Sequence, residues 1–278
     1  MTDRYVVVGN PVAHSVSPQI HTEFSRQTGQ DIDYARLLAP FDAFAATILK
    51  FRDEGGAGVN VTLPFKRAAW ELVKEHAGCA LAAEAVNTID FRDGRMIGHN
   101  TDGTGLVADL ENNLNFRIGG KRVLLMGAGG AAYGVMQPLL KLQPESLVVA
   151  NRTLAKALDL VAHFQQYEKS AARGVSARPY EELAGAQFDL VINATSAGLS
   201  DKMPPLPAGC FAPGALAYDM VYRKQTPFVK FAVEQGVRLS DGLGMLVEQA
   251  AESFFIWRGV RPATTPVIAK LRSGPGIS

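Results

Sequence analysis

Short runs rich in Val, Ile and Leu alternate with segments of helical period along almost the whole chain, and this alternation limits the folds open to it. Strands separated by helices form βαβ units, in which the strands pair in parallel. The run 122–126 is apolar after its first residue, as expected for a strand buried on both faces of a parallel sheet. The sequence therefore predicts an α/β fold with mostly parallel sheets.

A first series of such units is expected up to about residue 101. Ser17 followed by Pro18 is typical of an N-cap and a first helical turn, and predicts a helix that ends at Gly29. Asp93 and Gly94 predict a tight turn between two short strands. The expected strands are 5–8, 32–38, 58–62, 86–91 and 96–99, and the expected helices are 17–29, 42–52 and 68–74.

A second series follows and ends in helices alone. The simplest division of the chain gives an N-terminal α/β domain of residues 1–101 and a nucleotide-type unit of residues 102–242. Residues 243–278 are expected to pack back on the first domain. The expected strands are 122–126, 146–150, 188–192 and 216–220, and the expected helices are 102–115, one from about 130, 153–165, 243–257 and 265–271.

Composition excludes several classes of protein. A net charge of +1 gives no electrostatic reason to expect nucleic acid or a membrane surface as a partner. Cys79 and Cys210 stand far apart in no metal-binding motif, which favours a reduced, cytoplasmic protein without a metal site. The first residues carry no basic segment, and no apolar run approaches the ~20 residues of a membrane span, so we expect neither a signal peptide nor a transmembrane helix.

The stretch MGAGGAA, residues 126–132, lies between a predicted buried strand and a predicted helix. Gly127 permits a tight turn, Gly129 lets a pyrophosphate approach the backbone, and Ala132 is small enough to pack against the strand. The amides at the helix N-terminus then face the anion. The alternative is a tight structural turn without a ligand. The cofactor-binding candidates in this loop are Gly127, Ala128, Gly129, Gly130 and Ala131.

The end of the following strand indicates which dinucleotide is bound. An NAD site usually places an acid there for the ribose hydroxyls, but this chain reads ANRTLAK, with Asn151, Arg152, Thr153 and Lys156. An arginine fork can bind a 2′-phosphate that an acid would repel. NADP is therefore favoured over NAD. The alternative is that Arg152 and Lys156 are solvated charges at a helix start.

Two further loops follow predicted parallel strands, at the sheet edge where ligands bind in such folds. NATSAGL, residues 193–199, offers Thr195, and DMVY, residues 219–222, offers Met220 and Tyr222. These three residues are candidates for contact with the nicotinamide. Each could equally be a core or loop residue.

Neutral polar side chains gather in four stretches of the first domain, most of them near strand ends. In number, and with one lysine and one aspartate, they suit a small polyhydroxylated acid. Simpler roles are open: Ser17 could be an N-cap, Asp102 could cap the next helix, and Asn87 could serve a turn. The candidates are Ser15 and Ser17 in HSVSP, Asn60, Thr62 and Lys66 in NVTLPFK, Asn87 in AVNT, and Asn100, Thr101 and Asp102 in HNTDGTG.

Over essentially its whole length the chain resembles the shikimate dehydrogenase family. It carries GNPVAHSVSP, NVTLPFK, AVNT, NTDGTG, GAGGAA, NRT, NATSAG, DMVY and DGLGMLVEQAA in the family's order. The resemblance implies an N-terminal substrate domain, a doubly wound Rossmann-type NADP domain, and reversible reduction of 3-dehydroshikimate to shikimate. The family often has His-Asn where this chain has His21-Thr22, and a glycine where it has Glu84, which could alter the charge near the substrate.

The resemblance also implies a role for individual residues. Lys66 and Asp102 would form the catalytic pair, and Gly242 would lie near the nicotinamide. Ser15 and Ser17 would hold the substrate carboxylate. Asn60, Thr62, Asn87 and Gln249 would bind substrate hydroxyls, and Tyr222 is counted with the substrate-binding residues.

A lysine beside a carboxylate suits this reaction. Hydride addition to a ketone leaves negative charge on oxygen, which a lysine ammonium can neutralise with a proton. The alternatives are a quinate/shikimate dehydrogenase that uses NAD as well as NADP, and a catalytically silent NADP-binding sensor. A glutamyl-tRNA reductase would need a nucleophilic cysteine, and neither cysteine lies in a suitable motif. We expect a small-molecule substrate, no nucleic acid or membrane partner, and a monomer or homodimer.

Overall fold

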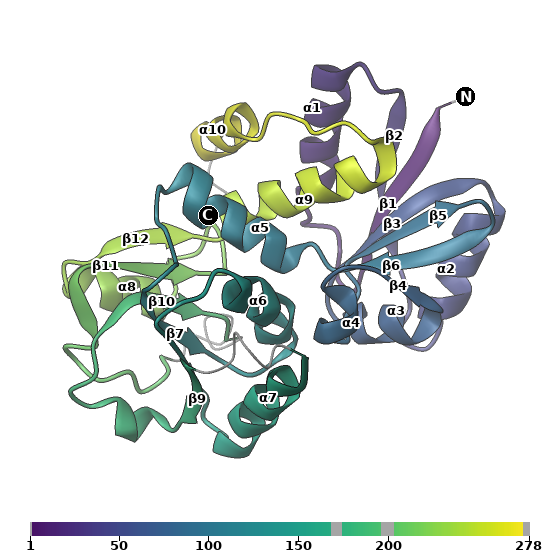
Figure 1. The fold of residues 1–278 in the computed structure, drawn as a ribbon. Coiled ribbons are helices and arrows are strands. Elements are labelled where there is room, and N and C mark those ends of the chain that lie inside the picture. The colour runs from purple at the N-terminus through teal and green to yellow at the C-terminus, as the bar shows by residue number, and fades with distance from the viewer. Residues whose placement is uncertain (1, 168–173, 196–202, 275–278) are drawn as a thin grey trace. The chain divides into compact units, whose positions relative to one another are not determined.

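A computed structural model describes residues 2–167, 174–195 and 203–274. The chain divides into two compact units, one formed by residues up to 105 together with 246–274, and the other by residues 106–245. Each unit is built on a six-stranded sheet (Figure 1). The predicted α/β class is therefore confirmed.

The sheet of the first unit has the order β2-β1-β3-β5-β6-β4 and is mixed. Strand β1 pairs in parallel with β2 and β3, whereas β5 runs antiparallel to both β3 and β6. The strands are β1 (Asp3–Gly9), β2 (Ile32–Leu38), β3 (Gly56–Val61), β4 (Glu75–His76), β5 (Thr88–Arg92) and β6 (Arg95–His99). The helices are α1 (Ser17–Thr28), α2 (Phe44–Asp53), α3 (Lys66–Leu72), α4 (Ala80–Ala83), α9 (Leu243–Arg258) and α10 (Thr265–Ser273), and α5 (Asp102–Ala108) begins here.

Alternating side chains give this sheet two buried faces. Val6 and Val8 lie in a core cluster with residues of α2 and α3. Tyr5 and Val7 point to the other face, where the Tyr5 ring stacks on Trp257 of α9 at a centroid distance of 4.5 Å. Helices α1 and α9 lie on this second face (Figure 1). The prediction that the terminal helices pack on the first domain is thus confirmed.

The sheet of the second unit is parallel throughout, in the order β12-β11-β10-β7-β8-β9. Read from β9, the strands follow the chain order 3-2-1-4-5-6 of a doubly wound dinucleotide fold, with the switch point between β7 and β10. The strands are β7 (Arg122–Met126), β8 (Ser146–Ala150), β9 (Val175–Arg178), β10 (Phe188–Asn193), β11 (Phe211–Asp219) and β12 (Arg238–Asp241). The helical segments are η1 (Asp109–Asn113), α6 (Gly130–Lys141), α7 (Leu154–Tyr167), η3 (Tyr180–Leu183) and α8 (Pro227–Glu234).

Some expectations were incomplete and one was wrong. Elements β4, α4, β9, α8 and β12 were not predicted, and the helix expected over 102–115 is α5 followed by the π-helical segment η1. The N-cap role of Ser17 is wrong, because Ser17 is the first residue of α1 and Val16 is the capping position, without a side-chain hydrogen bond. Across the described residues, no helix has the length and apolar character needed to cross a membrane.

Candidate active site

Lys66 and Asp102 come together at one edge of the first sheet. Lys66 begins α3 just after β3, and Asp102 begins α5 just after β6. The Lys66 Nζ donates to Asp102 Oδ2 at 2.6 Å, and the side chains are 26% and 9% exposed. The pair is held from the backbone as well, because the carbonyl of Lys66 accepts from the amide of Val86 at 2.9 Å. A partly buried ion pair that solvent can still reach is thus formed from two distant segments.

The amide of Asn87 holds the second oxygen of this carboxylate. Its Nδ2 donates to Asp102 Oδ1 at 2.9 Å. The backbone amide of Thr101 donates to Asn87 Oδ1 at 2.9 Å. A backbone N–H can only donate, so this contact fixes which end of the Asn87 amide faces Asp102. Gln249 of α9 accepts at Oε1 from Asn87 Nδ2 at 3.4 Å, which brings it to the same place.

The two serines lie side by side in the loop that leads into α1. The Ser15 hydroxyl donates to Ser17 Oγ at 3.2 Å, and the amide of Ser17 donates back to Ser15 Oγ at 3.3 Å. The guanidinium of Arg36 donates to the Ser15 carbonyl, with Nε 2.9 Å from the oxygen. Two hydroxyls held this close can bind the two oxygens of one carboxylate.

Thr62 and Asn60 come from the end of β3 and differ in exposure. Thr62 is partly exposed, and its methyl group packs where Gly9 has no side chain, since a Cβ there would lie 2.5 Å from Thr62 Cγ2. Asn60 is only 7% exposed. Its Oδ1 accepts from the hydroxyl of Tyr34 at 2.7 Å, and its Nδ2 donates to Thr88 Oγ1 and Ser253 Oγ, both at 3.0 Å.

The simpler roles considered for these residues do not describe what their side chains do. The Ser17 hydroxyl bonds Ser15 and caps no helix. Both carboxylate oxygens of Asp102 are engaged by the side chains of Lys66 and Asn87. Asn100 holds the backbone at Asp102, since its Oδ1 accepts from the Asp102 amide at 3.1 Å and its Nδ2 donates to the carbonyl of Ala85.

Glu84, the residue that departs from the family's glycine, has a left-handed backbone with φ of 46°. A glycine adopts this conformation without steric cost, which explains the family's choice. The Glu84 carboxylate is paired with the guanidinium of Arg67, which also contacts Glu71 and lies 4.5 Å from the ring centroid of Trp70. The negative charge at this position is therefore balanced locally.

In the second unit the glycine loop connects β7 to α6. Gly127 has φ of 105°, and a Cβ there would lie 3.0 Å from the carbonyl oxygen of Ala194, so the tight turn needs glycine. Gly129, Gly130 and Ala131 are exposed. A Cβ at Gly129 or Gly130 would meet no atom of the described residues within 4 Å, so the loop leaves its backbone open to a ligand. This open backbone at a helix N-terminus fits the pyrophosphate of a dinucleotide.

The residues expected to bind the 2′-phosphate follow β8. Asn151 folds the loop by donating from Nδ2 to the carbonyl of Thr153 at 2.8 Å. Arg152 and Lys156 are exposed near the start of α7, and neither forms an ion pair with any of the described residues. Cations at a helix N-terminus oppose the helix dipole, and a bound phosphate would relieve this. The residues present therefore fit NADP.

The candidate nicotinamide residues lie at the ends of β10, β11 and β12. The amide and hydroxyl of Thr195 both donate to Asn193 Oδ1, at 3.2 and 2.7 Å. Gly242 lies against Met220, where a Cβ would be 2.3 Å from the Met220 carbonyl oxygen. Tyr222 is partly exposed, and burial raises the pKa of its hydroxyl. Residues 196–199 of the predicted NATSAGL loop lie outside the described residues.

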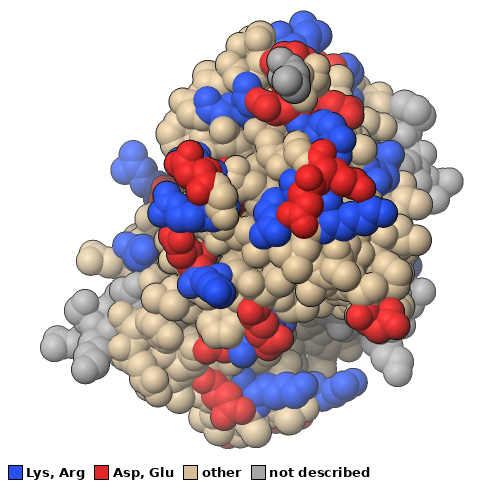
Figure 2. Space-filling model, turned by 90° about the vertical axis from the view of Figure 1, so that its right-hand side faces the viewer, with Lys and Arg blue, Asp and Glu red and all other residues tan. Residues whose placement is uncertain are grey.

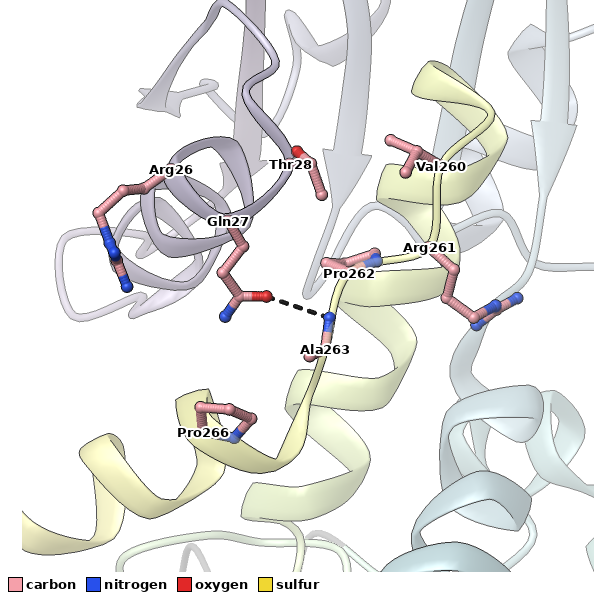
Figure 3. Close-up of a pocket in the computed structure, with 8 residues that line it drawn as sticks. All are labelled: Arg26, Gln27, Thr28, Val260, Arg261, Pro262, Ala263 and Pro266. Carbon is pink, nitrogen blue, oxygen red and sulfur yellow. Dashed lines mark hydrogen bonds between the residues drawn. The ribbon is translucent and has the colours of Figure 1, made fainter.

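The surface has further features away from these sites. Figure 2 shows acidic and basic side chains interspersed over one face of the molecule. A pocket of about 510 Å³ lies between the end of α1 and the connection from α9 to α10, where Gln27 accepts from the amide of Ala263 at 3.0 Å (Figure 3). Its lining includes Arg26 and Arg261, whose guanidinium groups are paired with Glu23 and Glu252. None of the predicted site residues lines it.

Sequence reasoning missed three residues that support the site. Tyr34, Thr88 and Ser253 all bond the amide of Asn60. Thr88 could have been found, because it follows Asn87 in the AVNT motif and faces Asn60 in the antiparallel pairing of β3 with β5. Tyr34 and Ser253 lie 26 and 193 residues from Asn60, with no local signal.

Comparison with known protein families gives three matches along the chain. The shikimate dehydrogenase substrate binding domain matches residues 7–89. The shikimate / quinate 5-dehydrogenase family matches residues 110–200, and the shikimate 5′-dehydrogenase C-terminal domain matches residues 242–272.

Individual relatives are similar over nearly the full length. The chain is 57% identical over 274 residues to the shikimate dehydrogenase (NADP(+)) of Laribacter hongkongensis, with 98% of each chain covered. An Ael1 enzyme from Pseudomonas putida is 46% identical, with a TM-score of 0.91 over 97% of this chain and 98% of that one. The shikimate 5-dehydrogenase of Thermus thermophilus, solved with NADP(H) and shikimate, is 33% identical, with a TM-score of 0.85 over 98% of this chain and 99% of that one.

Proposed function

Because this chain belongs to the shikimate dehydrogenase family, we propose that it catalyses the reversible NADPH-dependent reduction of 3-dehydroshikimate to shikimate. The observation that carries the proposal is the contact of 2.6 Å between Lys66 Nζ and Asp102 Oδ2, beside the amides of Asn87 and Gln249. A silent NADP-binding sensor would have no use for a lysine held in this way.

Bound NADPH supplies the hydride, and the first unit supplies the proton. Lys66 can protonate the oxygen that develops negative charge, and accept a proton from the substrate hydroxyl in the reverse direction. Asp102 fixes the ammonium through Oδ2, and Asn87 fixes the carboxylate through Oδ1. The proton donor is therefore oriented before the substrate arrives, so little reorganisation remains in the transition state.

The other candidate residues of the first unit bind the substrate in this proposal. Ser15 and Ser17, with their hydroxyl oxygens 3.2 Å apart, hold the carboxylate. Thr62, Asn87 and Gln249 bind the ring hydroxyls, and Asn60 belongs to the same set. Tyr222, just after the end of β11, is counted with the substrate-binding residues.

The cofactor residues form a second set. The open backbone of the loop at Gly127–Ala131 receives the pyrophosphate, and Arg152 and Lys156 receive the 2′-phosphate. Asn151 and Thr153 shape the loop after β8 that carries Arg152. Thr195, Met220 and Gly242 neighbour the nicotinamide in this proposal.

A two-by-two assay tests this proposal directly. Purified protein is given shikimate or quinate together with NADP⁺ or NAD⁺, and reduced cofactor is followed by absorbance. We expect turnover to be highest with shikimate and NADP⁺. Equal rates with quinate and NAD⁺ would instead support a quinate/shikimate dehydrogenase, and no turnover in any combination would support a sensor.

Location and assembly are part of the proposal as well. We propose a cytoplasmic enzyme without nucleic acid or membrane partners, which accords with a net charge of +1 and with the finding that, within the described residues, Cys79 and Cys210 form no disulfide. It acts as a monomer or a homodimer. Light scattering coupled to size-exclusion chromatography distinguishes the two states by mass.

A further inference from the structure

A chain of buried hydrogen bonds leads from β2, at one edge of the first sheet, to the Asp102 carboxylate. It begins at Tyr34, which is 7% exposed and stacks on the ring of His21 at a centroid distance of 4.1 Å and an interplanar angle of 5°. Burial lowers the pKa of His21 to about 3 and raises the pKa of Tyr34 well above its usual value. Both rings are therefore neutral at pH 7, and the Tyr34 hydroxyl retains its proton.

Backbone groups fix the orientation of both side-chain amides in this chain of bonds. The Asn60 Nδ2 lies 3.2 Å from the backbone carbonyl of Asn87, which can only accept, so Asn60 Oδ1 must face Tyr34. The Tyr34 hydroxyl consequently donates to Asn60. In the same way, the Thr101 amide fixes Asn87 with its oxygen toward Thr101 and its Nδ2 toward Asp102.

Thr88 connects the two amides. Its Oγ1 accepts from Asn60 Nδ2 and donates to Asn87 Oδ1, both at 3.0 Å. The bonds therefore run from Tyr34 to Asn60, then to Thr88, Asn87 and Asp102, and each group donates to the next. Hydrogen bonds aligned in this way polarise one another in a buried setting and favour a single arrangement of the network.

We propose that Tyr34 and Thr88 are positioning residues of the active site, whose hydroxyls hold the Asn87 amide with its N–H group on the Asp102 carboxylate. Neither residue has to contact the substrate. Without the Tyr34 hydroxyl, Asn60 Oδ1 loses its buried donor, and only the contacts of Nδ2 with Thr88, with Ser253 and with the Asn87 carbonyl still hold the amide. This inference rests on the roles proposed above for Lys66 and Asp102.

Tyr5 provides a matched control for Tyr34. It lies directly opposite Tyr34 in the parallel pairing of β1 with β2 and is 3% exposed. Its hydroxyl is 3.4 Å from Arg258 Nη1, away from the chain of bonds that reaches Asp102. Tyr5→Phe and Tyr34→Phe thus remove the same buried atom from the same sheet, but only the second touches the proposed network.

The experiment measures kcat for shikimate with NADP⁺, the KM for NADP⁺ at saturating shikimate, and the melting temperature. We expect Tyr34→Phe and Thr88→Val each to lower kcat about fivefold, which corresponds to about 1 kcal/mol, with the KM for NADP⁺ within about twofold of the parent. Tyr5→Phe should leave kcat within about twofold. Equal kcat values for Tyr34→Phe and Tyr5→Phe would overturn the proposal. If Tyr34→Phe does not fold, Thr88→Val decides the question by the same criterion.

A double variant separates positioning from a general structural effect. Tyr34 acts only through Asn60 in this proposal, so Tyr34→Phe should change kcat by less than about twofold when introduced into Asn60→Ala. Multiplied losses would overturn the proposal. The underlying function is tested separately, because Lys66→Ala with full turnover would refute the catalytic pair, whereas an inactive Lys66→Ala with an unimpaired Tyr34→Phe refutes the positioning role alone.

Discussion

In the first unit the candidate catalytic side chains are hydrogen-bonded to one another, whereas in the second unit the candidate cofactor residues largely face solvent. Lys66, Asp102 and Asn87 form one connected set, and Asn87 is 3% exposed. Gly129, Gly130 and Arg152 are exposed, and the space beside the two glycines is open. The candidate site of the first unit is therefore held in place by its own hydrogen bonds, whereas that of the second unit is open to solvent.

The difference follows from what each site must do. A proton donor must be oriented to within a fraction of an ångström, so its neighbours are fixed in the fold itself. A dinucleotide is a large anion, and backbone amides and mobile cations can bind it without prior pairing. Substitutions in the first unit should therefore act on turnover, and those in the second unit on cofactor affinity.

The largest effect is expected at Lys66. Lys66→Ala removes the proton donor, and kcat should fall by about 10²–10⁴-fold, the scale of general acid–base catalysis. Lys74→Ala is the control, since Lys74 is an exposed lysine of the same unit. Steady-state turnover is measured alongside calorimetric binding of shikimate and NADP⁺, and we expect both ligands still to bind.

Asp102→Asn should act in the same direction, because it disrupts the pair from the other side. The double variant should lose less than the product of the two single losses, since the residues work as a unit. Near-normal turnover in Lys66→Ala would remove the contrast between the two units altogether.

The next largest effect is expected at Arg152, and it should fall on affinity. Loss of a charge-assisted contact with the 2′-phosphate is worth roughly 1.5–3 kcal/mol, so Arg152→Ala should raise the KM for NADP⁺ by about ten- to a hundredfold. The KM for NAD⁺ should hardly change. Arg117→Ala serves as the control, because Arg117 is an exposed arginine of the same unit. If both cofactors lost affinity equally, Arg152 would not be the residue that selects NADP.

The contrast between the units also explains what could be predicted from the sequence. The long apolar strands and the glycine loop have local signatures, and the structure contains them. Strands β9 and β12, with the sequences VSAR and RLSD, have no apolar run and exist because they pair with β8 and β11. Pairing of this kind depends on tertiary structure, which a local pattern does not record.

The residues of the candidate site likewise divide into those with a local sequence signal and those without one. Lys66 and Asp102 could be named because they follow predicted strands and match family motifs. Tyr34 and Ser253 could not, because their only link to the site is a hydrogen bond to Asn60 across the fold. The N-cap prediction for Ser17 was wrong for a related reason, since the partner of its hydroxyl is Ser15 rather than the backbone of α1.

A smaller effect is expected at the serine pair, which binds substrate equally well before and during the reaction. Ser15→Ala and Ser17→Ala should each raise the KM for shikimate about tenfold, with little change in kcat. Ser25→Ala is the control, since its hydroxyl donates to the carbonyl of Gln30 at the other end of α1. A large fall in kcat at unchanged KM would place the serines with the catalytic pair instead.

The smallest effect distinguishes two glycines of one loop. Gly127 has φ of 105° and lies against the Ala194 carbonyl, so Gly127→Ala should lower the free energy of unfolding by about 1 kcal/mol or more. Gly129 has open space around it, so Gly129→Ala should leave the melting temperature of the free protein unchanged. The same variant should bind NADP⁺ more weakly, because the new methyl group occupies the space proposed for the pyrophosphate. Differential scanning calorimetry with and without NADP⁺ measures both effects. Should Gly129→Ala bind NADP⁺ as tightly as the parent, the open backbone would not be the cofactor site, and the second unit would lose the feature that separates it from the first.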